Sequence, residues 1–243
     1  AGDYALVAEC SDFSVARMEC GLAWLKVTLS GSSTYHPRKV LGGVDDPVDR
    51  SDVVSDLART TRALEEWAAD YCDRHTREYE HGTVRPIAGV GAVRAGEPTC
   101  PAAAPGTATI YLDVRLPPGE TAAFARREVE DALADLPVDA TVEPYLFRRG
   151  HVAGEAVEDL AGPLEAAHES VRGAEPTPPA PHLTSMWRDS NVFNGAGIPS
   201  VNFGPPRAPE AFPDSELSHA IWVEDLVDAA KIYALTAMEV VGG

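Results

Sequence analysis

The sequence predicts an α/β protein with a core sheet and a smaller inserted domain. The strands of the core sheet come from both ends of the chain, and the inserted domain lies between them in the sequence. Two short apolar runs indicate the core strands: residues 4–8, which end at Glu9, and residues 198–203 near the far end. Apolar runs of this length, bounded by turn residues, are typical of strands buried on both faces of a parallel sheet. The block between the two runs has its own helices and strands.

The inserted block begins with a predicted strand over residues 19–31, in which strongly apolar and less apolar side chains alternate, followed by a loop over residues 32–50. A helix is then expected, with Ser51 or Asp52 as its N-cap, and it should run to about Glu80. The residues expected on its inner face are Val54, Leu57, Leu64 and Trp67.

Two further strands, a helix and a last strand complete the inserted block. Their expected ranges are residues 87–95, 107–116, 121–134 and 138–147. The order is therefore strand, helix, strand, strand, helix, strand, which is the βαββαβ or split βαβ pattern of ferredoxin-like domains. Such a sheet has one face covered by two helices and a free edge that can pair with another copy.

The rest of the chain returns to the core. The expected elements are a helix, a Pro-rich linker and a short helix, over residues 154–172, 175–181 and 189–194. A closing helix follows from Val223. In this helix the positions Leu226, Ala230, Tyr233 and Ala237 recur at helical spacing, and the helix closes the domain. The predicted domains are residues 1–17 with 151–243 for the core and residues 18–150 for the insert.

The composition disfavours several classes of partner. A formal net charge of −18 disfavours nucleic acids and anionic membrane surfaces, because both are bound mainly through clustered Lys and Arg. No stretch approaches the length of a membrane span, and the first residues lack the features of a secretory signal, so a cytoplasmic location is expected. The four Cys residues show no metal-finger spacing and are expected to be mostly reduced.

Glu9 is the first candidate for chemistry. It directly follows the first core strand, and ligands of open α/β sheets bind at the carboxyl ends of the strands. From the residues alone, the alternative is a solvated carboxylate at a strand end.

With these elements in order, the chain resembles the M20 metallopeptidases, which include acetylornithine deacetylase, succinyl-diaminopimelate desuccinylase and carboxypeptidase G2-like enzymes. The motifs that carry the resemblance are Leu6-Val7-Ala8-Glu9, residues 113–119, residues 197–205 and residues 223–226. The resemblance covers nearly the whole chain. It implies the C-terminal part of an M20-like catalytic α/β sheet, with an inserted ferredoxin-like domain that serves as lid and dimerisation domain.

The resemblance also implies a reaction. M20 enzymes hydrolyse amide bonds of N-acyl amino acids or small peptides at a two-zinc site, where zinc lowers the pKa of its bound water and polarises the carbonyl. Glu9 matches a metal ligand of the family. His219 is the second candidate ligand, although Ser215 stands nearer the usual position and His219 could be a surface or capping residue.

Three further residues match substrate-handling positions of the family. His36 corresponds to a histidine that reaches into the site of a partner subunit and stabilises the oxyanion, and a loop histidine is the alternative. Arg115 matches an arginine directed at the substrate carboxylate, and an exposed strand position is the alternative. Asp189 lies in the segment that matches the substrate loop, where Trp187 is bulkier than the family pattern.

The family's remaining catalytic groups are missing. The resemblance implies an upstream half with a His-x-Asp ligand pair, a bridging Asp and a Glu-Glu pair that holds the base, whereas Glu65-Glu66 is the one Glu-Glu pair in this chain and lies within a predicted helix. This polypeptide alone is therefore not expected to hydrolyse amides.

Three interpretations remain open. The chain is the C-terminal part of a hydrolase completed by a separate or cleaved N-terminal segment, a non-catalytic binding or dimerisation module, or a fragment without an independent role. Under the first two, the unpaired strand edge and the apolar surface left by the missing half-sheet require a partner, and a homodimer through the insert is also expected.

Overall fold

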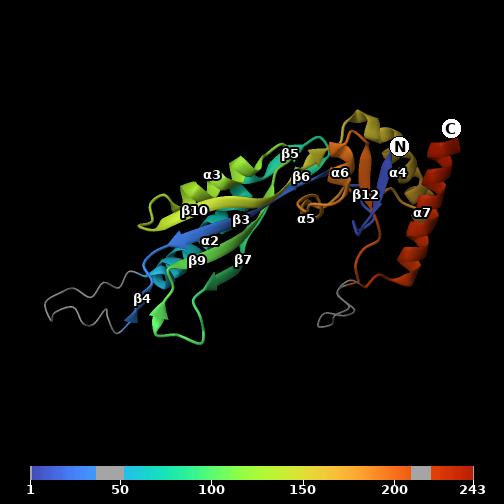
Figure 1. Cartoon of the computed structure of the whole chain (residues 1–243). Helices are drawn as coiled ribbons and strands as arrows, with labels where there is room; N and C mark the ends of the chain where they lie inside the picture. The colour runs from blue at the N-terminus through green and yellow to red at the C-terminus, as the bar shows by residue number, and fades with distance from the viewer. Residues whose placement is uncertain (1, 37–51, 209–219, 243) are drawn as a thin grey trace, which may run out of the picture.

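The computed structural model describes residues 2–36, 52–208 and 220–242. Figure 1 shows an elongated molecule, with a four-stranded sheet and two helices at one end and a small sheet flanked by helices at the other. The chain begins in the small sheet, crosses into the four-stranded sheet and returns after residue 150. The α/β class predicted from the sequence is confirmed.

The core sheet is small. β1 (Ala5–Ala8) and β12 (Ser200–Phe203) pair in parallel, as the two apolar runs predict. On its other side β12 is bridged by Ala16, whose N–H donates to the carbonyl of Asn202 at 3.0 Å. β12 is fully buried, whereas β1 is partly exposed because no strand of the described residues pairs with its outer edge.

Helices surround this sheet. They are the 3-10 turn η1 (Glu155–Val157), α4 (Glu158–Arg172), α5 (Pro181–Thr184), α6 (Ser190–Gly195) and α7 (Val223–Gly242). α4 and α7 pack against each other and against β12 over an apolar core that includes Val157, Leu160, Leu164, Val201, Phe203 and Ile232. The guanidinium of Arg172 lies 4.6 Å from the ring centroid of Phe13. No helix in the described ranges is long and apolar enough to cross a membrane.

The positions that recur at helical spacing in α7 are not the ones that the core buries. Leu226, Ala230 and Ala237 are exposed and Tyr233 is only half-buried. The buried positions are Asp225, Ala229, Ile232 and Thr236. Two polar residues are tolerated on this face because each has a partner: Asp225 accepts a hydrogen bond from Arg172 at 2.9 Å, and the Thr236 hydroxyl donates to the Ile232 carbonyl at 2.8 Å. The more apolar side of the helix therefore points away from the core.

The inserted block forms one antiparallel sheet in the order β10-β3-β9-β7. Its elements are β3 (Gly21–Ser30), α2 (Val53–His75), β7 (Ala88–Ala95), β9 (Thr107–Leu116), α3 (Ala122–Leu133) and β10 (Asp139–Arg148). Figure 1 shows both helices on the same face of this sheet. This is the βαββαβ order that the sequence predicts, and the other face stays uncovered by helices.

The first helix of the insert begins as expected but ends earlier. The Asp52 side chain caps α2 by accepting from the N–H of Ser55 at 2.8 Å. α2 ends at His75 rather than Glu80, because the next residues form a hairpin of β5 (Arg77–Tyr79) and β6 (Gly82–Val84). Val53 and not Val54 faces the core. A second short pair, β4 (Thr34–Tyr35) with β8 (Ala103–Ala104), was not expected from the sequence.

A two-stranded connection joins the two parts of the molecule. β2 (Met18–Glu19) leads into the insert and pairs with β11 (His151–Val152), which leads out of it. Gly21 and Gly150 touch directly here: a Cβ on Gly150 would overlap the backbone N of Gly21 and lie 2.8 Å from the carbonyl oxygen of Glu19. The predicted domain limits at residues 17/18 and 150/151 fall in this connection.

Gly150→Ala tests the importance of this contact. Since the added methyl group meets backbone atoms, which cannot rotate away, we expect a loss of about 1–3 kcal/mol in the free energy of unfolding. Urea denaturation measures it. The control is Gly154→Ala, where an added Cβ meets nothing within 4 Å. Equal stability of the two variants would show that the connection can relax.

Candidate functional site

A buried arginine lies where the core sheet, the connection and α6 meet. Arg188 has 2% of its side chain exposed. Its Nη1 donates to Glu19 Oε1 at 3.1 Å and to the Leu183 carbonyl at 2.7 Å, and its Nη2 donates to the Cys10 carbonyl at 3.2 Å. Its Nε lies 3.4 Å from Glu9 Oε2, an ion-pair distance without hydrogen-bond geometry. One guanidinium thus contacts two carboxylates from different segments.

Glu19 is the second buried charge of the cluster. Besides the bond from Arg188, its Oε2 accepts from the Ser190 hydroxyl at 2.6 Å. The next residue of α6, Asn191, donates to the Cys20 carbonyl at 3.1 Å and accepts from the His151 N–H at 2.8 Å. These contacts hold the start of α6 against the connection. Burial raises the pKa of Glu19 to about 7, and Arg188 and Ser190 only partly oppose this shift.

Glu9 lies at the carboxyl end of β1, as the sequence predicts, with 39% of its side chain exposed. The backbone there is tightly packed, because a Cβ on Gly204 would lie 2.8 Å from the carbonyl carbon of Glu9. The carboxylate is therefore held at the edge of the core sheet, with Arg188 as its charged neighbour.

The described residues do not fit a zinc ion at Glu9. The guanidinium of Arg188 lies 3.4 Å from Glu9 Oε2, and two like charges 4 Å apart near a protein surface repel by about 4 kcal/mol, a cost that doubles for a divalent ion. Within residues 2–36, 52–208 and 220–242, no group of three His, Cys, Asp or Glu side chains could hold a metal ion. His219, the other predicted ligand, and Ser215 lie outside the described residues.

Among the described residues, no hydrogen bond or ion pair joins the remaining predicted site residues to Glu9. His36 is exposed and directly follows β4, which Figure 1 places at the end of the insert away from the core sheet. Arg115 on β9 is bound by a neighbour in its own strand, since its Nη2 donates to Asp113 Oδ2 at 3.0 Å. Asp189 is exposed at the N-cap position of α6, and its side chain makes no capping bond.

A cavity of about 300 Å³ lies beside Arg188, between the connection and α6. The lining residues are Arg148, Arg149, His151, Trp187, Asn191, Val192 and Gly195. Burial and the charge of Arg149 lower the pKa of His151, so its ring is neutral at pH 7. The indole N–H of Trp187 is buried and has no hydrogen-bond partner among the described residues. The two arginines in the lining favour an anionic group such as a carboxylate.

Sequence reasoning missed this cavity and Arg188. The adjacent pair Arg148-Arg149 at the end of the last strand of the insert was the available signal. Arg188 gave none, because its partner Glu19 stands 169 residues earlier in the chain.

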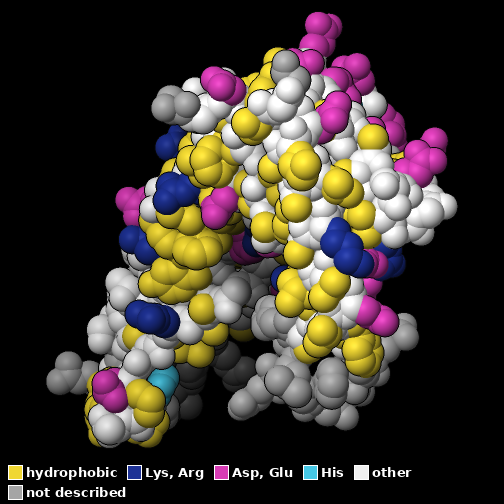
Figure 2. Space-filling model, turned by 90° about the vertical axis from the view of Figure 1, so that its right-hand side faces the viewer, with side chains coloured by type: hydrophobic (Ala, Val, Ile, Leu, Met, Phe, Trp, Pro, Cys, Tyr) yellow, Lys and Arg dark blue, Asp and Glu magenta, His cyan; other side chains and the backbone are white. Residues whose placement is uncertain are grey.

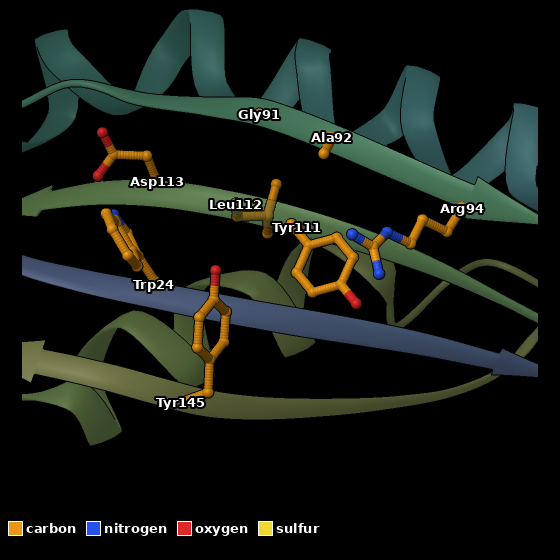
Figure 3. Close-up of a pocket in the computed structure, with 8 residues that line it drawn as sticks. All are labelled: Trp24, Gly91, Ala92, Arg94, Tyr111, Leu112, Asp113 and Tyr145. Atoms are coloured by element: carbon orange, nitrogen blue, oxygen red, sulfur yellow. The ribbon is translucent and has the colours of Figure 1, made fainter.

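A second hollow, of about 450 Å³, lies on the open face of the four-stranded sheet. Figure 3 shows its side chains on the side opposite the helices. Trp24 and Tyr111 each have their ring centroids 6.0 Å from that of Tyr145, and Arg94 lies 5.7 Å from the centroid of Tyr111. Asp113 is the acid in the lining. This aromatic surface shares no residue with the cavity at α6.

No family model matches the chain. Among solved structures, it is similar to a hydantoinase/carbamoylase family amidase from Burkholderia ambifaria, with a TM-score of 0.67 and 13% identity over 99% of this chain and 54% of that one. It is also similar to AtUAH in complex with glyoxylate, with a TM-score of 0.65 and 14% identity over 96% of this chain and 50% of that one. The chain has the fold of these enzymes. The M20-type fold expected from the sequence is thus confirmed.

The dipeptidase Dug1p from Saccharomyces cerevisiae shares the same fold, with a TM-score of 0.62 and 12% identity over 100% of this chain and 58% of that one. The chain therefore spans about half the length of the structures that it matches. Almost the whole of this chain has a counterpart in them, whereas about half of each of those enzymes has none here.

Glu19 should make stability depend on pH. Because its pKa rises from 4.5 to about 7 on folding, the folded protein keeps a proton that the unfolded chain releases. The free energy of unfolding is therefore highest below pH 4.5. It falls by up to about 3 kcal/mol as the pH rises to 7. Urea denaturation between pH 4.5 and 8 should show this decline, and Glu19→Gln should flatten it. Glu175→Gln, at an exposed position, is the control and should keep the wild-type slope.

Proposed function

We propose that this chain is the C-terminal part of an amide-bond hydrolase, in which it supplies the substrate-binding wall of the site. One observation carries this proposal: the chain matches an amidase over 99% of its own length but only 54% of the amidase. The catalytic groups missing from this chain would belong to the segment that fills the rest of that length.

The cavity beside Arg188 supports a substrate with a carboxylate, such as an N-acyl amino acid or a small peptide. Arg148 and Arg149 in its lining offer charged donors. AtUAH has been solved with glyoxylate, which is a small carboxylate, and Dug1p is a dipeptidase. In this proposal the chain binds the substrate carboxylate, orients the amide and excludes water from one side.

The two zinc ions implied by the resemblance would be held mainly by the missing segment. Glu9 faces Arg188 and does not fit a zinc ligand, so His219 remains the candidate ligand from this chain. No step of the reaction is assigned here to a metal. The expected location of the complete enzyme is the cytoplasm.

The alternative function is a non-catalytic binding or dimerisation module. The contact between Arg188 and Glu9 favours it, because an internal cation neutralises the carboxylate that the family uses for a metal. The same carboxylate-binding cavity would then serve recognition alone.

Activity and metal content separate the two functions. The purified chain should hydrolyse no N-acetyl, N-succinyl or N-carbamoyl amino acid and no dipeptide, and elemental analysis should find zinc well below one ion per chain. With the polypeptide encoded directly upstream of residue 1 supplied, both should appear. Full activity of the chain alone would refute the proposal, and a metal-free, inert assembly would support the binding module.

In the complemented enzyme, Arg149→Gln should raise KM roughly tenfold with little change in kcat, since it removes one charged hydrogen bond. Arg126→Gln on α3, outside the cavity, is the matched control. An unchanged KM for Arg149→Gln would show that the cavity does not bind the substrate.

The homodimer expected from the insert would form along β7. Both β7 and β10 are edges of the four-stranded sheet. β10 is protected by Pro144 and by acidic side chains such as Glu143. β7 has the sequence Ala-Gly-Val-Gly-Ala-Val-Arg-Ala, with one charge and no Pro, and most of its residues are exposed. We therefore propose that two copies pair through β7.

Val93→Lys tests this dimer. Val93 is half-exposed on β7, and a lysine there places like charges near each other in the paired strands, so we expect a monomer in light scattering after size exclusion. Thr141→Lys places the same charge on the other edge and should keep the dimer. If both variants remain dimeric, or if the wild type is a monomer, β7 is not the interface.

A further inference from the structure

α7 has a second apolar face that nothing in the described chain covers. The buried positions Asp225, Ala229, Ile232 and Thr236 lie on one side of the helix. On the opposite side an exposed stripe consists of Val223, Leu226, Ala230, Ala234, Ala237 and Val241, which we name the α7 stripe. Their spacing of three and four residues places all six on one face.

The stripe is wide, long and free of charge. Val227 and Met238 extend it on one flank and are 47% and 72% exposed. From Val223 to Val241 it runs about 27 Å at 1.5 Å per residue, which is the length of one packed helix. Figure 2 views the molecule from the side on which α7 lies in Figure 1 and shows hydrophobic side chains gathered over this face. A helix that is apolar on both sides is typical of the interior of a larger fold.

The centre of the stripe is shaped for a helix. Ala230, Ala234 and Ala237 have small side chains, so a second helix can approach closely along them. Beyond Val227 and Met238 the stripe is bordered by Lys231 and Glu224, which carry opposite charges. The best-fitting partner is therefore an amphipathic helix that lays its apolar face along the stripe.

The length of the matched enzymes indicates where that helix comes from. Nearly half of the Burkholderia ambifaria amidase has no counterpart in this chain. The outer edge of β1 pairs with no strand of the described residues, and α7 packs on the core that β1 and β12 share. The segment that extends the sheet beyond β1 is thus the natural source of a helix that covers α7.

We propose that the α7 stripe is the docking surface for an amphipathic helix of the segment encoded directly upstream of residue 1. This proposal shares one premise with the proposed function, namely that the chain is the C-terminal part of a longer fold. It assigns α7 a role in assembly and none in catalysis.

The experiment is co-purification of the chain with the tagged upstream segment, with the stoichiometry measured by light scattering. The wild type should form a one-to-one complex. Ala234→Lys, at the centre of the stripe, should weaken the complex at least tenfold. Ala69→Lys, the same change at an exposed position of α2, is the matched control and should bind like the wild type. Since both positions are exposed, circular dichroism of each variant alone should match the wild type.

Each outcome decides the proposal. A complex that Ala234→Lys leaves intact, or a reading frame that encodes no such segment before residue 1, overturns it. A homodimer of the wild-type chain that Ala234→Lys disrupts also overturns it, because a second copy is then the occupant. A complex that depends on the stripe but hydrolyses no amide supports the docking surface while refuting the proposed function.

Discussion

The guanidinium of Arg188 is the constraint on which the candidate site depends. An unpaired buried charge costs several kcal/mol, so Arg188 is compatible with this fold only while its acceptors stay in place. Those acceptors come from the end of β1, from the connection and from α5. The end of the core sheet, the entry to the insert and the start of α6 are therefore positioned together by one side chain.

This arrangement sets what the chain contributes to chemistry. A carboxylate at a strand end commonly attracts cations, but here the cation is part of the protein and occupies the neighbourhood of Glu9. The cavity between the connection and α6 is lined by Arg148 and Arg149. The described half of the fold is thus better suited to recognising an anion than to activating water. This division between recognising an anion and activating water agrees with the fold comparison, in which about half of each similar enzyme has no counterpart here.

Local signals allowed most elements to be predicted from the sequence. The alternation in β9 and the caps at Asp52 and Thr121 depend on neighbours within a few residues, so they are legible in one sequence. Arg188 could not be found in this way, because its partners are distant in the chain. The buried face of α7 could not be predicted from periodicity for a different reason. The strongest apolar periodicity marks the stripe through Ala230 and Ala237, whereas the core that is present contacts Ala229 and Ile232.

The contact between Gly21 and Gly150 has a mechanical consequence. Two backbones touch there without intervening side chains, and beside them α5 is fastened to the insert because the Thr184 hydroxyl donates to the Thr83 carbonyl at 2.6 Å. A small rotation at this junction would become a large displacement at the far end of the insert, where Figure 1 places β4. The position of His36, which directly follows β4, therefore depends on the angle that the glycine pair and α5 together set at the distant junction.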